Sequence, residues 1–455
     1  MVDPTEDLIC PVDFRYGRPE VRRLFTRRAR LDRALRVEAA LALAEAELGR
    51  IPIEAGASIE RAASGSKVTL ARVDALEAEL KHDVMAIARA LAEQAGEAGA
   101  WVHYGATSAD ITESALALEH QAAARILRAD LTDLARALLD LARLHRATPS
   151  VGRTHGQHAV PLSFGYKMAG AAAEVLRHRD RLDELMPRLA VGKMAGAVGT
   201  GAGFGDQAES IEERVMARLG LTADEAPTQI VGRDRIAELT NLLALVASTA
   251  ERLATEVRNL QRTEIGEAAE PFDEARQVGS STMAQKRNPI VTENVTSLAR
   301  LVRALALPPL ENMVLWHERD LSNSANERIV LPHAIVLTDD LLTKLTTVFR
   351  GLKIDTGRMA ENLDRSKGNV MAENLMLALT ARGVPRAEAH EMIRTLTRDE
   401  GTRVPLAVRA QNEPSITKWL TAPEILELLD PERYVTSAAA KTDRVIARLG
   451  PRLEQ

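Results

Sequence analysis

The apolar positions of the chain repeat most regularly between Arg235 and Gln261. Large and small apolar side chains recur every seven residues in two interleaved sets, Leu239, Val246, Leu253, Leu260 and Leu243, Ala250, Val257. This a/d pattern, sustained over more than three heptads, is typical of a long helix packed in a bundle. We therefore predict one helix over this whole stretch.

A second apolar seam precedes it and contains Leu127, Leu131, Leu134, Leu138 and Leu141. Its helix has a plausible N-terminal cap at Asp110, because Glu113 follows three residues later. The stretches Leu31–Leu48 and Leu70–Leu91 are predicted as shorter amphipathic helices. Apolar stripes of this kind usually face a core, so they indicate an all-α fold with a central long-helix bundle and do not by themselves indicate a function.

Two segments interrupt the helical pattern. The first, Gly192–Gly205, contains Gly199-Thr200-Gly201-Ala202-Gly203, but Phe204 occupies the last position of the dinucleotide-binding spacing, which disfavours a nucleotide loop. The second, Thr263–Pro289, is long, polar and aperiodic, as functional lids and binding loops often are. A solvated linker is the alternative interpretation of the second segment.

We place the domain boundaries where the helical seams begin and end. The expected domains are an N-terminal helical domain (1–105), a central long-helix bundle with the polar loop (106–355) and a C-terminal helical domain (356–455). The last domain contains Pro405, Pro414, Pro423 and Pro431, which predicts short helices joined by turns.

Composition narrows the class of protein. The chain has 455 residues, of which 45% are hydrophobic and 27% charged, as in a soluble globular protein, and aromatic residues make up only 3%. Cys10 is the single cysteine, so an internal disulfide is excluded and a reducing, cytoplasmic location is expected. No secretory signal or membrane span is expected. The net charge of −5 argues against a general nucleic-acid binder.

Three polar segments could carry chemistry. Arg153-Thr154-His155-Gly156-Gln157-His158 holds two histidines, which could ligate a metal only with further ligands, or could include a proton-transferring histidine beside a tight glycine. His103-Tyr104-Gly105-Ala106-Thr107-Ser108 offers either an anion site at a helix start or ordinary caps. Glu318-Arg319-Asp320, with Ser324 and Arg328, offers arginines for a phosphate or carboxylate, or a surface ion-pair network.

Together these segments resemble the fumarase/aspartase superfamily. Gly279-Ser280-Ser281-Thr282-Met283-Ala284-Gln285-Lys286-Arg287-Asn288-Pro289 is similar to its signature loop, although Ala284-Gln285 replaces a proline and its following residue. Thr154-His155-Gly156 and Gly105-Ala106-Thr107-Ser108 resemble its two other shared regions. The branch that cleaves adenylosuccinate is the most similar, through Arg15-Tyr16-Gly17, Lys81-His82-Asp83-Val84, Thr228-Gln229, Arg233-Asp234 and Glu318-Arg319-Asp320.

The resemblance implies elimination of fumarate from adenylosuccinate, giving AMP, and from succinylaminoimidazole carboxamide ribotide in purine biosynthesis. It implies Ser280 as the base, His155 as the acid that protonates the departing nitrogen, Glu293 as the residue that orients His155, and Lys286 and Asn288 as stabilisers of the dianionic intermediate. The implied substrate-binding residues are Arg15, Tyr16, His82, Asp83, His103, Thr107, Ser108, Thr154, Gln229, Met283, Arg319, Ser324 and Arg328.

The resemblance further implies a homotetramer whose active sites each combine three subunits, with no metal and no organic cofactor. Neither a nucleic acid nor a membrane is expected as a partner. Two alternatives remain at this stage. One is a sister fumarate-releasing lyase or a carboxymuconate cycloisomerase-like enzyme, which would not need the set Arg319, Ser324 and Arg328. The other is a non-catalytic structural protein on the same scaffold.

Overall fold

The computed structural model describes residues 8–65, 67–273, 275–277, 282–283, 285–398 and 403–454. The chain divides into two compact units, each assembled from three separate stretches. Unit 1 comprises residues 1–131, 178–250 and 297–343, and unit 2 comprises residues 132–177, 251–296 and 344–455. None of the helices in the described ranges is long and apolar enough to cross a membrane.

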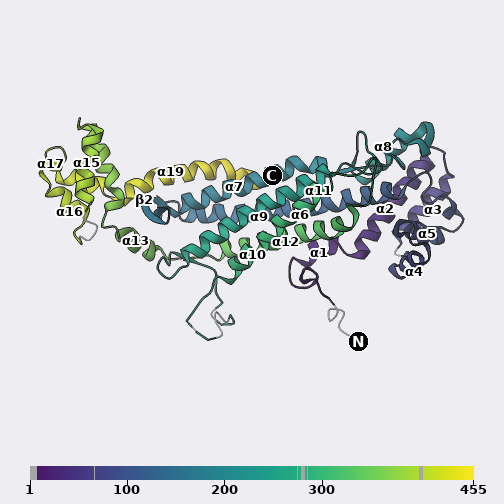
Figure 1. The fold of residues 1–455 in the computed structure, drawn as a ribbon, viewed down its shortest axis with the longest axis horizontal. Coiled ribbons are helices and arrows are strands. Elements are labelled where there is room, and N and C mark those ends of the chain that lie inside the picture. The colour runs from purple at the N-terminus through teal and green to yellow at the C-terminus, as the bar shows by residue number, and fades with distance from the viewer. Residues whose placement is uncertain are drawn as a thin grey trace. The chain divides into compact units, whose positions relative to one another are not determined.

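Helices dominate the fold, as predicted, and Figure 1 shows their course along the chain. Long helices with residues in both units are α6 (Ser108–Leu144), α7 (Phe164–Leu189), α9 (Asp234–Leu260), α10 (Ile290–Ala304) and α12 (Ser324–Arg350). The a/d seam of α9 is confirmed, because every one of its predicted apolar positions is buried.

The remaining elements of unit 1 lie wholly within that unit. They are η1 (Pro11–Asp13), α1 (Pro19–Leu24), α2 (Arg27–Glu47), α3 (Ile53–Ser64), α4 (Leu70–Leu80), α5 (Asp83–Ala95), η2 (Gly96–Trp101), β3 (Val191–Gly192), η3 (Ala202–Gln207), α8 (Ala208–Leu219), β4 (Thr222–Ala223) and α11 (Leu307–Glu311). Strands β3 and β4 pair in parallel.

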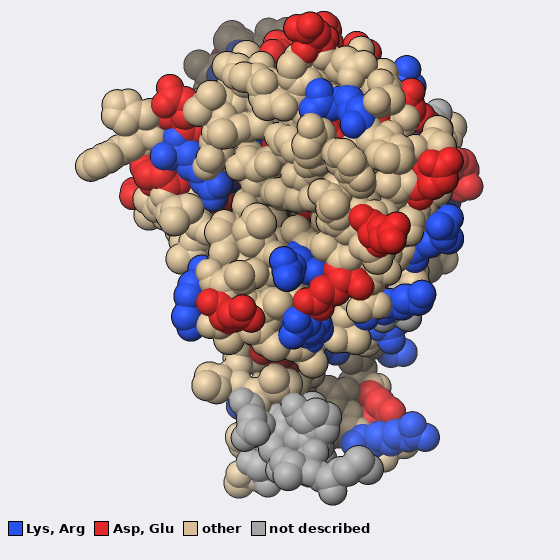
Figure 2. Space-filling view, turned by 90° about the vertical axis from the view of Figure 1, so that its right-hand side faces the viewer, with Lys and Arg blue, Asp and Glu red and all other residues tan. Residues whose placement is uncertain are grey.

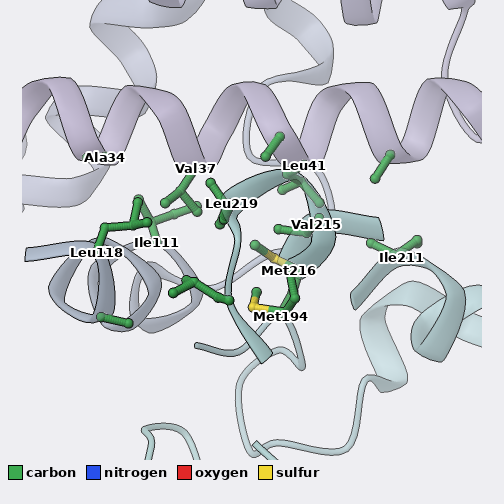
Figure 3. Close-up of a cluster of buried hydrophobic side chains, with 14 of the residues drawn as sticks. Ala34, Val37, Leu41, Ile111, Leu118, Met194, Ile211, Val215, Met216 and Leu219 are labelled. Carbon is green, nitrogen blue, oxygen red and sulfur yellow. The ribbon is translucent and has the colours of Figure 1, made fainter. Parts of the chain in front are cut away.

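Helix α2 organises the core of unit 1 because apolar side chains surround it on two sides. Val37 and Leu41 pack with Ile111 of α6 and Val215 of α8, and Figure 3 shows these side chains converging from the three helices. Leu35, on the other side of α2, belongs to a second cluster with residues of α3, α4 and α5. A helix that is apolar on both sides is buried between its neighbours.

The prediction of a single helix over Leu70–Leu91 is wrong. Lys81 adopts a left-handed conformation, with φ of 55°, and terminates α4. His82 then caps α5, because its ring Nδ1 accepts a hydrogen bond from the Met85 backbone N–H at 3.4 Å. The break places His82 and Asp83 at an exposed helix start.

The described part of unit 2 contains two short strand pairs and the C-terminal helices. Strands β1 (Pro149–Thr154) and β2 (Gln157–Ser163) form an antiparallel hairpin, and β5 (Ala268–Ala269) pairs antiparallel with β6 (Lys353–Ile354). The helices are α13 (Thr356–Asp364), η4 (Asn369–Met371), α14 (Ala372–Ala381), α15 (Arg386–Thr397), α16 (Leu406–Gln411), α17 (Pro414–Thr417), α18 (Ala422–Leu428), α19 (Pro431–Leu449) and η5 (Gly450–Glu454). Leu375, Leu379 and Ile416 are fully buried in the apolar cluster that the C-terminal helices form.

Charge is dispersed over the face of unit 1 that carries α3, α4, α5 and α8. Figure 2 shows basic and acidic side chains interspersed on that face, with no broad field of one sign. The ion pairs Arg72–Glu93 and Arg218–Glu47 belong to this pattern. An anionic ligand must therefore be held by local groups rather than by a basic surface.

Candidate active site

The segment Gly105–Ser108 leads directly into α6. Asp110 lies in the first turn of this helix, so its prediction as the N-terminal cap is wrong. Its carboxylate instead reaches back and accepts a hydrogen bond from the Thr107 backbone N–H at 2.8 Å. The carboxylate thereby occupies the first turn, where negative charge is stabilised by the helix dipole, and fixes the entry of Thr107 and Ser108.

The glycine-rich segment predicted between Gly192 and Gly205 is the support of this entry. Lys193 and Asp110 form an ion pair in which both side chains are fully buried. Asp110 also accepts hydrogen bonds from the backbone N–H groups of Ala195 at 3.0 Å and Gly196 at 3.2 Å. The segment therefore wraps the start of α6 and is no dinucleotide-binding loop.

Gly105 is required where this segment meets Phe204. Its φ is 77°, and a Cβ at this position would lie 2.8 Å from the ring of the fully buried Phe204. Any side chain here would both strain the backbone and displace the aromatic ring. The glycine thus allows the close approach that sets the position of Thr107 and Ser108.

Three elements of unit 1 bring His82, Asp83, Ser108 and Arg328 together. The His82 Nε2 and the Ser108 Oγ are 3.5 Å apart, and Arg328 Nη2 of α12 donates to Asp83 Oδ2 at 3.1 Å. Arg328 is exposed, so this pairing leaves most of its guanidinium available to an anion. These contacts confirm that the residues are neighbours; their binding roles stay predictions.

Gln229 and Arg319, both predicted as site residues, contact each other in the structure. Arg319 Nη1 donates to Gln229 Oε1 at 3.3 Å, and the Gln229 backbone N–H donates to the Glu318 carbonyl at 3.2 Å. Because the amide oxygen of Gln229 accepts from Arg319, its NH₂ group faces away as a donor. Residues 318–320 precede α12, and Ser324 is the first residue of that helix.

The segment with Arg15 and Tyr16 is held against α12 by the two residues that follow it. The Gly17 backbone N–H donates to Asp340 Oδ1 at 3.0 Å, and Arg18 Nε donates to Asp339 Oδ1 at 2.9 Å. Arg18 also donates to Asp130 at 2.6 Å. Arg15 itself is exposed, as a ligand-binding arginine must be.

His103 lies in the loop between η2 and α6 and contacts Glu38 of α2. Its Nδ1 is 2.7 Å from Glu38 Oε1. Burial acts to lower the pKa of His103, but the hydrogen bond and the charge of Glu38 outweigh it, so the pKa of His103 is raised. The imidazole is therefore stabilised as a cation near neutral pH.

Arg233, which carries part of the resemblance, is a structural residue in this fold. It donates both terminal nitrogens to Glu113 at 2.6 Å, and its Nε lies 3.1 Å from Glu327. Burial acts against the charge, but Glu113 and Glu327 hold the pKa of Arg233 above its usual range. The ion pair joins α6, α9 and α12 within unit 1.

In unit 2, His155 occupies the turn of the β1–β2 hairpin. His155 has φ of 54° and Gly156 has φ of 75°, and Thr154 pairs with Gln157 across the turn. Two successive residues with positive φ are typical of the type I′ turn that matches the twist of a hairpin. The turn presents Thr154, His155 and His158 in exposed positions.

A buried ion pair fixes this hairpin. Arg153 donates two hydrogen bonds to Glu267, at 2.9 and 2.6 Å, and Asn362 Nδ2 donates a third to the same carboxylate at 2.8 Å. Arg153 also contributes with burial to a lowered pKa of His158, with burial the larger cause. Arg153 therefore anchors the hairpin. No sequence pattern around Arg153 indicates this role.

The signature-like loop is only partly described. Ser280 lies outside the described residues, whereas Met283 and Lys286 are exposed and joined by a hydrogen bond from the Lys286 N–H to the Met283 carbonyl at 3.0 Å. Asn288 is half-buried just before α10, and Glu293 is exposed in its first turn. These exposed or half-buried positions are compatible with contact to a ligand.

Glu270 holds the exit of this loop at the start of α10. Its carboxylate accepts hydrogen bonds from the backbone N–H groups of Val291 at 3.1 Å and Thr292 at 2.6 Å. Gln261 donates to the Arg287 carbonyl at 3.0 Å and accepts from the Glu270 N–H at 3.0 Å. A cavity of about 250 Å³ lies here, lined by Asn288 among others.

Within the described part of unit 2, His155 and Glu293 are not hydrogen-bonded to each other. The pairing of His155 with Glu293 that the resemblance implies stays a prediction. Among the same described residues, no group of three or more His, Cys, Asp and Glu side chains has the arrangement of a metal site.

Sequence reasoning missed the residues that position these groups. Lys193, Glu38 and Glu267 contact partners 83, 65 and 114 residues away in sequence, respectively. The available signal was a charged residue at a position that helical periodicity or a glycine-rich context marks as buried. Only the fold identifies the partner.

Comparisons with known proteins show that this chain is a lyase. A family model described as "Lyase" matches residues 13–304, and one described as "Adenylosuccinate lyase C-terminus" matches residues 368–445. An adenylosuccinate lyase of Pyrococcus abyssi is 48% identical over 96% of this chain and 97% of its own length. The chain belongs to the adenylosuccinate lyase family.

Solved structures of related enzymes have the same fold. A fumarate lyase from Mesorhizobium superposes with a TM-score of 0.87 at 32% identity, covering 95% of this chain and 98% of that chain. A 3-carboxy-cis,cis-muconate lactonizing enzyme from Pseudomonas putida superposes with a TM-score of 0.87 at 33% identity, covering 97% of this chain and 99% of that chain. The all-α fold of the fumarase/aspartase superfamily is thus confirmed.

Proposed function

We propose that this chain eliminates fumarate from adenylosuccinate, giving AMP, and performs the same elimination on succinylaminoimidazole carboxamide ribotide. The observation that carries the proposal is the nearly full-length, 48% identical relative named adenylosuccinate lyase, together with the matched C-terminal region specific to that enzyme. The reaction places the protein in purine nucleotide biosynthesis, and a cytoplasmic location accompanies that role.

The chemistry assigned to each residue follows from charge development. A base, Ser280 by resemblance, removes a proton from the carbon beside a carboxylate, and Lys286 and Asn288 stabilise the dianion that forms. The carbon–nitrogen bond then breaks, and His155 donates a proton to the departing nitrogen. No metal or organic cofactor enters these steps. The exposed hairpin turn supports the role of His155, because the proton donor must reach the substrate.

Substrate binding is divided between two groups of side chains. One group contacts the substrate and comprises His82, Asp83, Thr107, Ser108, Thr154, Gln229 and Met283. The other surrounds the nucleotide and its phosphate and comprises Arg15, Tyr16, His103, Arg319, Ser324 and Arg328. The exposed guanidinium of Arg328 and the Arg319–Gln229 contact support the second group. The division of the chain at about residues 105 and 355 into three domains is part of the same proposal.

The proposal includes a homotetramer with composite active sites. Large apolar side chains remain exposed on the long helices, including Leu245 of α9, Leu301 of α10 and Ile329 of α12, each more than half exposed. Such side chains on neighbouring long helices are suited to burial against other subunits.

The experiment is a fumarate-release assay with adenylosuccinate, followed by ultraviolet absorbance, on wild type, Ser280→Ala and His155→Ala. Wild type should convert adenylosuccinate to AMP and fumarate, and each variant should lose orders of magnitude in kcat while remaining folded. Mixing the two inactive variants, after dissociation and reassembly, should restore part of the activity if the sites are shared between subunits. Near-wild-type turnover in either variant would remove that residue from the mechanism.

The muconate-type alternative is tested in the same assay. The P. putida structure favours it as the second candidate, because its TM-score of 0.87 equals that of the Mesorhizobium fumarate lyase. Its substrate has no phosphate, so Arg328→Ala should leave its turnover unchanged but raise the KM for adenylosuccinate. Conversion of 3-carboxy-cis,cis-muconate without conversion of adenylosuccinate would overturn the proposal.

A further inference from the structure

The contact between His103 and Glu38 fixes which nitrogen of the imidazole carries a proton. His103 Nδ1 lies 2.7 Å from Glu38 Oε1, and only 10% of the histidine side chain and 1% of the glutamate side chain are exposed. An ionised carboxylate can only accept hydrogen bonds, so Nδ1 is the donor. A buried acceptor of this kind keeps a proton on Nδ1 both in the neutral ring and in the imidazolium.

The second ring nitrogen is left for a ligand. Within the described part of the chain, Nε2 of His103 makes no hydrogen bond, and His103 precedes the Tyr104-Gly105 turn into the segment with Thr107 and Ser108. The backbone of His103 has φ of 64°, a conformation that residues other than glycine rarely adopt. A strained backbone beside a ring nitrogen that has no hydrogen-bond partner within the described chain is typical of a functional position.

The charges that face this histidine come from α2, the following turn and α6. On α2, Glu38 contacts the ring, and Glu45 lies farther along, 3.4 Å from Arg50. The Arg50 guanidinium stacks over the Tyr104 ring, 5.3 Å from its centre. On α6, Asp110 faces His103 but is already paired with Lys193. Glu38 is therefore the carboxylate committed to the ring.

The second oxygen of Glu38 supports the same conclusion. Oε2 is buried and has no hydrogen-bond partner among the described residues. A buried carboxylate with one oxygen unsatisfied is costly unless a cation is close, and His103 is the cation at hydrogen-bond distance. The two groups therefore stabilise each other as an ion pair, with the charge of the imidazolium also directed to Nε2–H.

We propose that Glu38 is a positioning residue that holds the ring of His103 so that Nε2–H donates to an anionic group of the substrate. We take this anion to be a phosphate monoester, whose oxygens accept charge-assisted hydrogen bonds from an imidazolium. The identity of the phosphate as that of the nucleotide rests on the proposed function. The contact between Nε2–H and an anion does not depend on the proposed function.

A purely structural role for Glu38 gives a different outcome. In that case the hydrogen bond only ties α2 to the loop after η2, and its loss would reduce stability without changing how ligand affinity depends on pH. The positioning role predicts that the proton on His103 and the affinity for a phosphate change together. A direct titration of His103 separates these two roles.

The first measurement is the titration of His103 by NMR in full-length protein with ¹³C-labelled histidine. The chain has 10 histidines, and a His103→Gln variant identifies the signal. Glu38→Gln should lower the pKa of His103 by about 1 or more, because an opposite charge at this distance has that effect. The matched control is Glu45→Gln, which removes a buried carboxyl from the same helix without touching His103 and should leave its titration unchanged.

The second measurement is binding of AMP and of inorganic phosphate over the same pH range. In wild type, affinity should fall as pH rises through the pKa of His103, and in Glu38→Gln the fall should begin about one pH unit lower. For adenylosuccinate the same displacement should appear in KM, with kcat within about threefold of wild type because the proton transfers use other groups. Glu38→Asp should retain part of the wild-type pH dependence.

Two results would overturn the inference. One is an unchanged His103 titration in Glu38→Gln, and the other is a lowered pKa of His103 with no displacement in AMP or phosphate binding. If Glu38→Gln does not fold, Glu38→Asp tests the same point, with a smaller displacement of the His103 pKa and of phosphate binding in the same direction. A protein that fails to cleave adenylosuccinate but shows the displaced phosphate binding would refute the proposed function and leave the role of Glu38 intact.

Discussion

The buried pair of Lys193 and Asp110 allows a sharp prediction for stability. Both side chains have no exposed surface, and the Lys193 ammonium donates to Asp110 and to the Gly196 carbonyl at 3.1 Å. The Asp110 carboxylate accepts further hydrogen bonds from the backbone N–H groups of Thr107 at 2.8 Å and Ala195 at 3.0 Å. Both charges at this position therefore have hydrogen-bonded partners.

The perturbation is Lys193→Met, which keeps most of the side-chain volume and removes the charge. Removing one partner of a buried pair costs about 3–5 kcal/mol, because the other charge is left uncompensated. The backbone N–H groups that remain on Asp110 favour its charged form, so we expect the lower end, about 3 kcal/mol. That corresponds to an approximately 150-fold change in the unfolding equilibrium.

Urea denaturation followed by circular dichroism, at one fixed protein concentration, measures this loss. The control Lys167→Met breaks the partly exposed pair with Glu256 and should cost less than about 1 kcal/mol. The double variant Asp110→Asn, Lys193→Met should recover part of the loss, since no unpaired charge remains. A Lys193→Met protein within 1 kcal/mol of wild type would refute the reasoning that this pair fixes the start of α6.

Three further predictions follow from other contacts. Arg153→Met should lower the free energy of unfolding by about 2–3 kcal/mol, because it leaves Glu267 buried without its cation, and should lower kcat by shifting the hairpin. Denaturation measures the first effect and fumarate release the second, and unchanged values for both would refute the prediction. Gly17→Ala, whose Cβ would lie 2.2 Å from Val336 and whose φ is 75°, should cost about 2 kcal/mol or more and raise KM; a variant of wild-type stability would contradict the close approach. Burial raises the pKa of Glu45 to about 7, with Arg50 opposing; because the unfolded value is lower, this contribution destabilises the fold progressively as pH rises from about 4 to 7. Denaturation midpoints measured between pH 4 and 8 should therefore fall less with rising pH in Glu45→Gln than in wild type.

The long helices could be predicted from the sequence because their signal is local and repeated. Leu239, Leu243 and Val246 are buried as the heptad pattern predicts. The single helix predicted over Leu70–Leu91 was wrong because the pattern of apolar residues continues across the break at Lys81 and His82. Neither residue is a common terminator, and the left-handed turn there becomes favourable only when α4 and α5 pack on the same core.

The candidate site was predictable as a set of segments but not as an arrangement. The resemblance singles out His155 and Arg319, and the structure places them on an exposed turn and beside Gln229, respectively. The residues that hold them have no signature of their own. Arg153 and Lys193 look like ordinary surface cations in sequence, and their buried carboxylate partners are distant along the chain.

Backbone conformation links these separate observations. The residues other than glycine with positive φ in the described part of the chain are Lys81, His103, His155, His317 and Lys367. His103 and His155 are themselves predicted site residues, and Lys81 and His317 directly precede His82 and Glu318. A left-handed conformation costs on the order of 1–2 kcal/mol for such residues, so it persists only where surrounding contacts determine it. Glu38 holds His103 by a hydrogen bond, and Arg153 anchors the strand that ends at His155. In each of these two turns a buried ion-pair contact therefore supports a histidine conformation that would otherwise cost stability.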